Sequence, residues 1–315
     1  MSDSKVLSDF DALKNAAPSS RWGPGARMGV IGGRGEMGRL FARFFEEWGY
    51  RISVADRSTV PGNREVVENS DVVLFAVPLH ETVAVIRELI PYVRPDQLLM
   101  DLTSLKEPPI REMLRSQASV VGLHPMFGGR ISSFKGQTLV ACPVRIEPAD
   151  WACLRRLFEE RGVKVKEATP REHDRMMSII QVLFHMTTML TGRVLRDYGV
   201  DIAETMEYTS PSYRLEMNML GRIFAQNGAL YSAITQMNPY TKEILGLLRE
   251  GLDRYEEWYD QQNLDAFVED FQRSAEHLGD FTRRAYQESA AILDFTVQLA
   301  NSNQPDTKQV ADRSG

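Results

Sequence analysis

The stretch "GVIGGRGEMGRLFARFF" at residues 29–45 decides the fold. An apolar run leads into a G-x-G-x-x-G pattern, and a helix-like pattern follows at once. A strand that enters a helix through such a turn directs unpaired N–H groups and the positive end of the helix dipole at one point. The pattern predicts that the pyrophosphate of a dinucleotide lies on this loop. The predicted loop residues are Gly33, Arg34, Gly35, Glu36, Met37 and Gly38.

An acidic residue follows the next predicted strand. Asp56 comes after Arg51–Ala55, at close to the ~20-residue separation typical of a carboxylate that binds the ribose hydroxyls. This carboxylate would repel a 2′-phosphate, which favours NAD over NADP. Arg57 beside it could instead hold such a phosphate or be an exposed surface charge, so NADP stays open.

Short apolar runs alternate with helical patterns as far as residue 168, which predicts an α/β fold. The sheet is expected to be a doubly wound, parallel sheet of the Rossmann type, covered by helices on both faces. The predicted strands are Met28–Ile31, Arg51–Ala55, Asp71–Val77, Leu98–Leu102, Val120–Leu123, Thr138–Cys142 and Val163–Glu167. The predicted helices are Met37–Trp48, His80–Leu89, Pro108–Ser116 and Ala149–Arg161.

From Pro170 onward the strand patterns stop. The segment "PREHDRMMSIIQVLFHMTTMLTGRVL" predicts one long helix that begins at Pro170 and is too apolar for a solvent-exposed surface. We therefore expect a flexible segment at 1–26, a nucleotide-binding domain at 27–168, a helical substrate and dimerisation domain at 169–300, and a disordered tail at 301–315.

Composition excludes several classes of function. The formal charge of −6 provides no basic surface for nucleic acid. The two cysteines suit a reducing compartment and cannot form a tetrahedral metal site, and no metal is expected. No signal peptide and no apolar run long enough for a membrane span is found, which favours a cytoplasmic protein.

Three strand ends carry candidate chemistry, because ligands of an open parallel sheet bind beyond the carboxyl ends of its strands. Val77 and Pro78 are expected to border the nicotinamide, and "DLTSLK" supplies Ser104 and Lys106. His124 leaves a third strand, and the ordinary pKa of histidine suits a base that takes a hydroxyl proton. A histidine that only caps the strand and a serine that only caps a helix are the structural alternatives.

Several segments resemble the prephenate dehydrogenase family, in particular its branch fused to chorismate mutase in enteric bacteria. They are the glycine loop, "DLTSLK", "GLHPMFG", "REHDRMMSIIQVLFHMTTM", "SPSYRLEMNMLGRIFAQ" and Leu230-Tyr231. The resemblance covers residues 27–300, and about 25 residues precede the first strand, too few for a mutase module.

The resemblance implies NAD-dependent oxidative decarboxylation of prephenate to 4-hydroxyphenylpyruvate, in the biosynthesis of tyrosine, by a homodimer joined through its helical domain. His124 would be the base, and Ser104 would bind the substrate hydroxyl and the histidine together. Arg222 would bind a substrate carboxylate, with Arg214 as the neighbouring candidate.

Four further residues are candidates. Gln181 and His185 lie four positions apart, and by the same resemblance both are expected near the substrate, although His185 could be a core histidine. Lys106 is expected to reach a substrate carboxylate or a cofactor phosphate, or to be an exposed lysine. His173 is expected to serve the start of the long helix.

One departure leaves the substrate open. Phe184 stands where relatives of the fused branch have arginine, which keeps 4-amino-4-deoxyprephenate and arogenate as alternatives. A 3-hydroxyacid or 6-phosphogluconate type of dehydrogenase is disfavoured because the long helix contains no lysine. A non-catalytic NAD-sensing protein is the alternative from another class, and it would need no base at the sheet edge.

Overall fold

The computed structural model describes residues 21–302, which form two compact units. The first unit extends to Val182 and also includes Leu230–Thr241. The second comprises Leu183–Ala229 and the chain from Lys242 onward. The predicted disordered tail from residue 303 and the first twenty residues of the predicted flexible segment lie outside the described residues.

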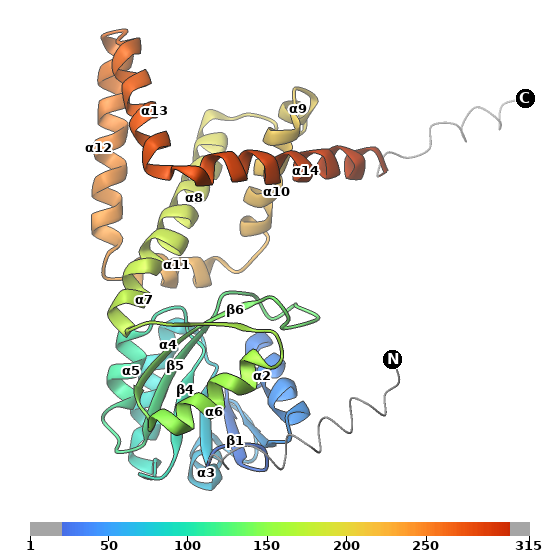
Figure 1. The fold of residues 1–315 in the computed structure, drawn as a ribbon, viewed down its shortest axis with the longest axis vertical. Coiled ribbons are helices and arrows are strands. Elements are labelled where there is room, and N and C mark those ends of the chain that lie inside the picture. Colours follow the sequence, from blue (N-terminus) through green and yellow to red (C-terminus); the bar gives the residue numbers. More distant parts are fainter. Residues whose placement is uncertain (1–20, 303–315) are drawn as a thin grey trace, which may run out of the picture. The chain divides into compact units, whose positions relative to one another are not determined.

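The first unit contains a seven-stranded sheet with the order β2-β1-β3-β4-β5-β6-β7 (Figure 1). The predicted α/β fold of the Rossmann type is confirmed, and each predicted strand has a counterpart. The strands are β1 (Arg27–Ile31), β2 (Arg51–Ala55), β3 (Val72–Phe75), β4 (Leu98–Asp101), β5 (Ser119–Pro125), β6 (Thr138–Arg145) and β7 (Lys164–Glu167). The chain order places β1 between β2 and β3, so the carboxyl ends of these strands share one edge with those of β4 and β5.

One pairing differs from the predicted parallel sheet. Strand β6 runs antiparallel to β5, whereas β7 pairs with β6 in parallel. Residues 126–137, which join β5 to β6, contain no helix. A parallel neighbour needs a crossover connection, whereas a direct return of the chain gives an antiparallel pair.

Helices cover both faces of the sheet, and each face has its own apolar core. On one face α2 (Glu36–Glu47) and α6 (Pro148–Glu159) pack on alternate strand residues such as Met28 and Val30. On the other face α3 (Asn63–Asn69), α4 (Leu79–Leu89) and α5 (Glu107–Met113) pack on residues such as Ile31 and Phe75. A 3₁₀ turn, η1 (Ile90–Tyr92), follows α4, and neither α3 nor η1 was predicted from the sequence. Burial on both faces explains why the strand patterns are continuously apolar.

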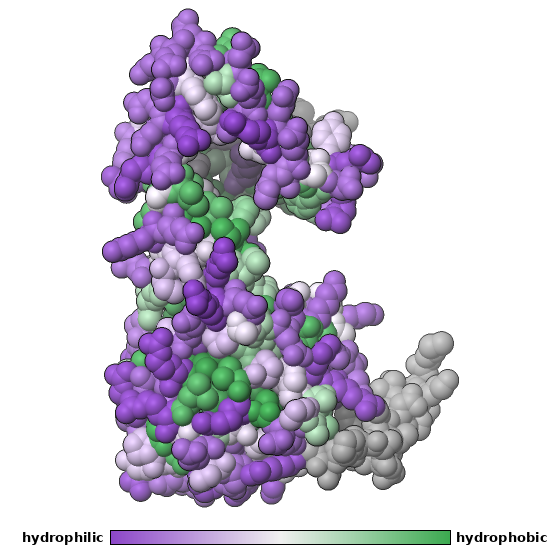
Figure 2. Space-filling model, turned by 60° about the vertical axis from the view of Figure 1, so that its left-hand side comes forward, coloured by the Kyte–Doolittle hydropathy of each residue, from purple (hydrophilic) through white to green (hydrophobic). Residues whose placement is uncertain are grey.

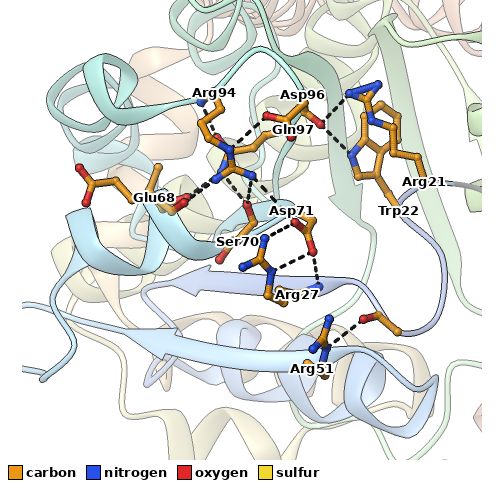
Figure 3. Close-up of polar contacts among 12 residues, drawn as sticks. Arg21, Trp22, Arg27, Arg51, Glu68, Ser70, Asp71, Arg94, Asp96 and Gln97 are labelled. Atoms are coloured by element: carbon orange, nitrogen blue, oxygen red, sulfur yellow. Dashed lines mark hydrogen bonds and ion pairs between the residues drawn. The ribbon is translucent and has the colours of Figure 1, made fainter.

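Charged and polar residues form ion pairs and hydrogen bonds between the amino ends of the central strands, at the edge opposite the predicted nucleotide site (Figure 3). Arg27 at the start of β1 forms an ion pair of 2.6 Å with Asp71, which directly precedes β3. Arg94 donates to the carbonyl of Ser70 at 3.0 Å, and Gln97 donates to the same carbonyl at 2.7 Å. Hydrogen bonding from Arg27 lowers the pKa of Asp71, so this carboxylate stays charged.

The predicted long helix is interrupted. It begins at Pro170 as α7 (Pro170–Met177), continues as the π-helical segment η2 (Ser178–Leu183) and resumes as α8 (Phe184–Tyr198). Thr169 and Glu172 form a capping box at its start. The His173 side chain, which we expected to serve the helix start, contacts His124 and Asp174 instead. Inserted π turns occur frequently at functional sites.

The second unit is helical. Besides α8 it contains α9 (Ile202–Glu207), α10 (Pro211–Phe224), α12 (Thr241–Asp260), α13 (Leu264–Leu278) and α14 (Asp280–Ser302), while α11 (Gly228–Met237) lies mostly in the first unit. Helix α10 packs against α8 and α14. Within residues 21–302, no helix has the length and apolar character to cross a membrane.

Candidate active site

The glycine loop lies between β1 and α2, as the sequence predicts, and its glycines are required by close packing. Gly32 has a φ of +80°, so the tight turn lies one residue before the predicted motif. A Cβ on Gly33 would lie 2.5 Å from the Val54 side chain, and one on Gly38 would lie 2.7 Å from the Cα of Gly33. The glycines therefore let the start of α2 approach β1.

The start of α2 is exposed and has no side-chain cap. Gly35 is the N-cap residue, and no side chain caps the helix. Arg34, Gly35 and Glu36 are exposed, while Met37 is half-buried. A helix start without a side-chain cap, with its unpaired N–H groups and positive dipole end, is suited to a phosphate.

Two other strand ends pack against this loop. A Cβ on Gly32 would lie 2.7 Å from the carbonyl oxygen of Ala76, which follows β3 and precedes Val77 and Pro78. Gly129, in the loop after β5, approaches the backbone of Glu36 so closely that its Cβ would lie 3.0 Å from the Glu36 carbonyl carbon. The segment that follows His124 therefore lies directly on the nucleotide loop.

Asp56 directly follows β2, and its neighbour Arg57 is already paired. The carboxylate of Asp56 accepts the backbone N–H of Arg57 at 2.8 Å. The exposed guanidinium of Arg57 forms an ion pair with Glu81 in the first turn of α4. The hydrogen bond from Arg57 lowers the pKa of Glu81. Asp56 is thus the acidic group next to the loop whose charge no ion pair offsets among the described residues.

His124 lies near the end of β5 and is only 3% exposed. Its Nδ1 is 2.8 Å from Nε2 of His173, and its Nε2 is 3.4 Å from the Gln181 side-chain nitrogen. Burial first, then the nearby His173 and Lys106, hold the pKa of His124 well below 6.5. The imidazole is therefore neutral near pH 7 and has one nitrogen able to accept a proton.

Gln181 reaches His124 from the π-helical segment. Its side-chain oxygen is buried and makes no hydrogen bond within the described part of the chain. A buried carbonyl oxygen without a donor is costly unless a ligand or water supplies one. The structure therefore brings Gln181 next to His124, while its expected place near the substrate stays a prediction.

Ser104 and Lys106 both follow β4, but their side chains differ in burial and in hydrogen bonding. The Ser104 hydroxyl is half-buried and has no hydrogen-bond partner among residues 21–302, and it does not cap α5. Lys106 is fully buried, and its ammonium pairs with Asp101 and donates to the carbonyl of Leu123 at 2.7 Å. The prediction that Lys106 binds substrate or cofactor, or is exposed, is wrong.

The remaining predicted substrate residues belong to the second unit. Arg214 and Arg222 both lie on α10, separated by about 12 Å along the helix axis, and Arg222 is exposed. Neither guanidinium forms an ion pair with a described residue. His185 lies on α8, half-buried, and burial lowers its pKa below 6.5.

Large apolar side chains lie on the surface of the second unit. Helices α8, α9, α10 and α13 contain no buried residue in the described chain. Figure 2 shows hydrophobic side chains at the molecular surface among hydrophilic ones. The exposed ones include Val194, Tyr198, Phe224, Leu252, Phe271 and Phe295. A soluble helix normally buries one face, so this unit presents apolar faces that no other part of the described chain covers.

The sequence matches two family models. Residues 46–167 match the nucleotide-binding domain of prephenate dehydrogenase, and residues 169–273 match its dimerization domain. The chain is 34% identical over 265 residues to the T-protein of Haemophilus influenzae, covering 84% of this chain and 70% of that protein. It is 32% identical over 302 residues to the probable arogenate/prephenate dehydrogenase of Methanocaldococcus jannaschii, covering 90% and 68%.

The fold also matches a solved structure. Prephenate dehydrogenase from A. aeolicus, in complex with hydroxyphenyl propionate and NAD+, superimposes with a TM-score of 0.63 at 15% identity. The match covers 79% of this chain and 96% of that one. This match shows the fold, and the two family models and the relatives above establish that the chain belongs to the prephenate dehydrogenase family.

Proposed function

We propose that this protein catalyses the NAD-dependent oxidative decarboxylation of prephenate to 4-hydroxyphenylpyruvate, with His124 as the base. The observation that carries the proposal is the buried imidazole of His124 at the end of β5, where the following loop packs on the uncapped start of α2. NAD+ would supply the acceptor for the hydride that leaves C4 of the substrate ring.

The role of His124 follows from its protonation state. Nε2 would take the proton of the C4 hydroxyl as the C4–H bond breaks and its electron pair leaves as hydride. Cleavage of the bond between C1 and the carboxylate then releases CO2, and its electrons complete the aromatic ring. Gln181 would donate from its amide to the hydroxyl oxygen, and Ser104 would supply a second hydroxyl contact at the neighbouring strand end.

The cofactor is assigned to the glycine loop. Gly33 to Gly38 would hold the pyrophosphate through backbone N–H groups, and Val77 and Pro78 would border the nicotinamide. Asp56 would accept hydrogen bonds from the ribose hydroxyls and repel a 2′-phosphate. Because Arg57 is paired with Glu81, it offers less charge to such a phosphate, which supports NAD rather than NADP.

The second unit would supply the cations that a dicarboxylate substrate requires. Arg222 can form two parallel hydrogen bonds to a carboxylate, and its guanidinium has no ionic partner among the described residues. Arg214 and His185 are the further candidates on α10 and α8. The exposed apolar side chains of these helices support a homodimer formed through this unit.

A kinetic comparison tests the function. Purified protein with NAD+ and prephenate should yield NADH, CO2 and 4-hydroxyphenylpyruvate in equal amounts. His124→Asn should lower kcat by about 10²- to 10⁴-fold while leaving the Kd for NAD+ within about threefold. Unchanged kcat in His124→Asn would contradict the proposal that His124 is the base.

The ring substituent and side arm of the substrate require a separate comparison. Phe184 is 62% exposed on α8, at the position where the fused branch has arginine. This replacement supports testing 4-amino-4-deoxyprephenate and arogenate beside prephenate, each with NAD+ and NADP+. Tight NAD+ binding without NADH formation on all three substrates would favour a sensing role instead.

A further inference from the structure

Three buried side chains form a hydrogen-bonded series that begins at Nδ1 of His124, on the side of the ring opposite the nitrogen that the reaction would use. Nδ1 of His124 lies 2.8 Å from Nε2 of His173, and Nδ1 of His173 lies 2.7 Å from Oδ1 of Asp174. The three residues are 3%, 1% and 0% exposed. Water therefore cannot supply alternative partners, and the ring hydrogens of the two histidines must be placed so that these three side chains satisfy one another.

The carboxylate of Asp174 fixes the direction of these hydrogen bonds. Oδ1 accepts the backbone N–H of Lys106 at 2.7 Å, and Oδ2 accepts that of Glu107 at 2.9 Å. Asp174 is thus an acceptor at both oxygens, so Nδ1 of His173 must carry the hydrogen that it donates to Oδ1. In a neutral imidazole the other nitrogen is then an acceptor, and it accepts the hydrogen from Nδ1 of His124.

The tautomer of His124 follows from this sequence of donors and acceptors. With the hydrogen on Nδ1, Nε2 has a free lone pair, and this is the atom that faces the Gln181 amide at 3.4 Å. An amide nitrogen beside Nε2 is consistent with this assignment, because it can donate to the lone pair. The opposite tautomer would set two lone pairs against each other at Nδ1, facing Nε2 of His173, and two N–H groups against each other at Nε2, facing the Gln181 amide.

We propose that His173, oriented by Asp174, is a positioning residue that holds His124 as the Nδ1–H tautomer and leaves Nε2 as the proton acceptor. This inference rests on the proposed role of His124 as a base. His173 also gives the charged imidazolium a hydrogen-bond acceptor once Nε2 has taken a proton, and Asp174 places a negative charge one ring away. The capping box at Thr169 accounts for the helix start without His173.

The tautomer can be measured without turnover. In protein labelled with ¹⁵N in its five histidine rings, long-range correlation spectra separate Nδ1–H from Nε2–H forms. The His124→Asn variant assigns the ring. We expect the Nδ1–H form for His124 in the wild-type protein, and an Nε2–H form there overturns the proposal.

Three variants test the cause. His173→Phe removes the acceptor, so His124 should lose its Nδ1–H preference, and kcat should fall about 10²- to 10⁴-fold with KM changed less than threefold. His173→Gln places an amide oxygen near the position of Nε2 and should keep the tautomer, with kcat within roughly tenfold of wild type. Met177→Leu, a buried change on the same helix, should alter neither.

The outcomes separate this inference from the proposed function. An unchanged tautomer in folded His173→Phe overturns the positioning role, and so does equal loss of kcat in the Gln and Phe variants. If the Phe variant does not fold, the wild-type tautomer and the Gln variant decide. If no cyclohexadienyl substrate is turned over, the proposed function fails while the tautomer measurements still test His173.

Discussion

Lys106 and Asp101 form an ion pair in which neither side chain has any solvent exposure. The ammonium also donates to the Leu123 carbonyl, one residue before His124. Removing one partner of a buried pair leaves an uncompensated charge and costs about 3–5 kcal/mol. We predict that Lys106→Met lowers the free energy of unfolding by about that amount, measured by urea denaturation.

The matched control is Lys166→Met, which removes an exposed lysine on β7 of the same sheet. Its free energy of unfolding should change by less than about 0.5 kcal/mol. If Lys106→Met kept full stability and only raised KM, the lysine would be a substrate ligand after all, and the buried pair would be the wrong account.

The same lysine shows where sequence patterns stop being informative. Apolar runs and the glycine motif predict the strand positions and the order of the first elements, because burial on two faces and close packing act locally. The partner of a lysine does not follow from its neighbours in the chain. Whether Lys106 points outward or into the sheet depends on Asp101 and on a carbonyl of another strand.

His173 illustrates the same limit for the site. It lies 49 positions from His124, and only the fold brings the two rings together. Its position in "REHD" marked it as part of a family motif but suggested a local role at the helix start. One signal in the sequence was available. Thr169 and Glu172 have the spacing of a capping box and already satisfy the start of that helix, so His173 is not needed there. A histidine with no local task is a candidate for a distant partner.

The antiparallel pairing of β6 has a comparable origin. Its run of apolar residues has the pattern of a central parallel strand, because both faces are covered in either case. The direction depends on whether a helix intervenes, and residues 126–137 contain aromatic residues that could have belonged to one. In the fold, Phe127 instead stacks on Phe41 of α2, with ring centroids 6.5 Å apart.

The pH dependence of turnover follows from the lowered pKa of His124. Burial, His173 and Lys106 all disfavour its protonated form. Because the neutral form acts as the base, activity is lost only when His124 becomes protonated, so the acid limb must lie below 6.5. We predict that kcat/KM for prephenate is constant from about pH 8 down to about pH 6.5 and falls at lower pH.

The exposed His80 provides the comparison, since His80→Gln should leave the profile unchanged. An acid limb centred at or above 6.5 would contradict the buried, neutral imidazole. Unfolding must be followed over the same range. A lowered pKa in the folded state means that the unfolded chain binds more protons just below pH 6.5, so stability also declines as the pH falls.

Cofactor preference depends on the pairing of Arg57 with Glu81. Glu81→Gln removes the carboxylate that holds the guanidinium, and the released arginine can turn toward a 2′-phosphate. We predict that kcat/KM for NADP+ rises about three- to tenfold in Glu81→Gln while that for NAD+ changes less than twofold, since an exposed pair contributes up to about 1 kcal/mol.

Glu88→Gln serves as the control, because it removes the same charge from an exposed position on α4. It should leave the ratio of the two cofactors at its wild-type value. Equal gains in both variants would mean that net charge, rather than the Arg57 pair, sets the preference.

Arg222 is the residue that we propose to bind a substrate carboxylate. It lies in the second unit, and its guanidinium has no ion-pair partner among the described residues. Arg222→Gln removes a charged hydrogen-bond donor, worth about 1.5–3 kcal/mol, so KM for prephenate should rise about 10- to 100-fold with the Kd for NAD+ unchanged. Arg222→Lys keeps the charge but not the paired donors, so its KM for prephenate should lie between those of the wild type and Arg222→Gln.

The control is Arg249→Gln, which replaces an exposed arginine on α12 that forms no ion pair in the described chain. It should leave KM within twofold of wild type. If steady-state kinetics gave Arg222→Gln the same KM as Arg249→Gln, the substrate carboxylate would have to be bound elsewhere, and Arg214 would be the next residue to replace.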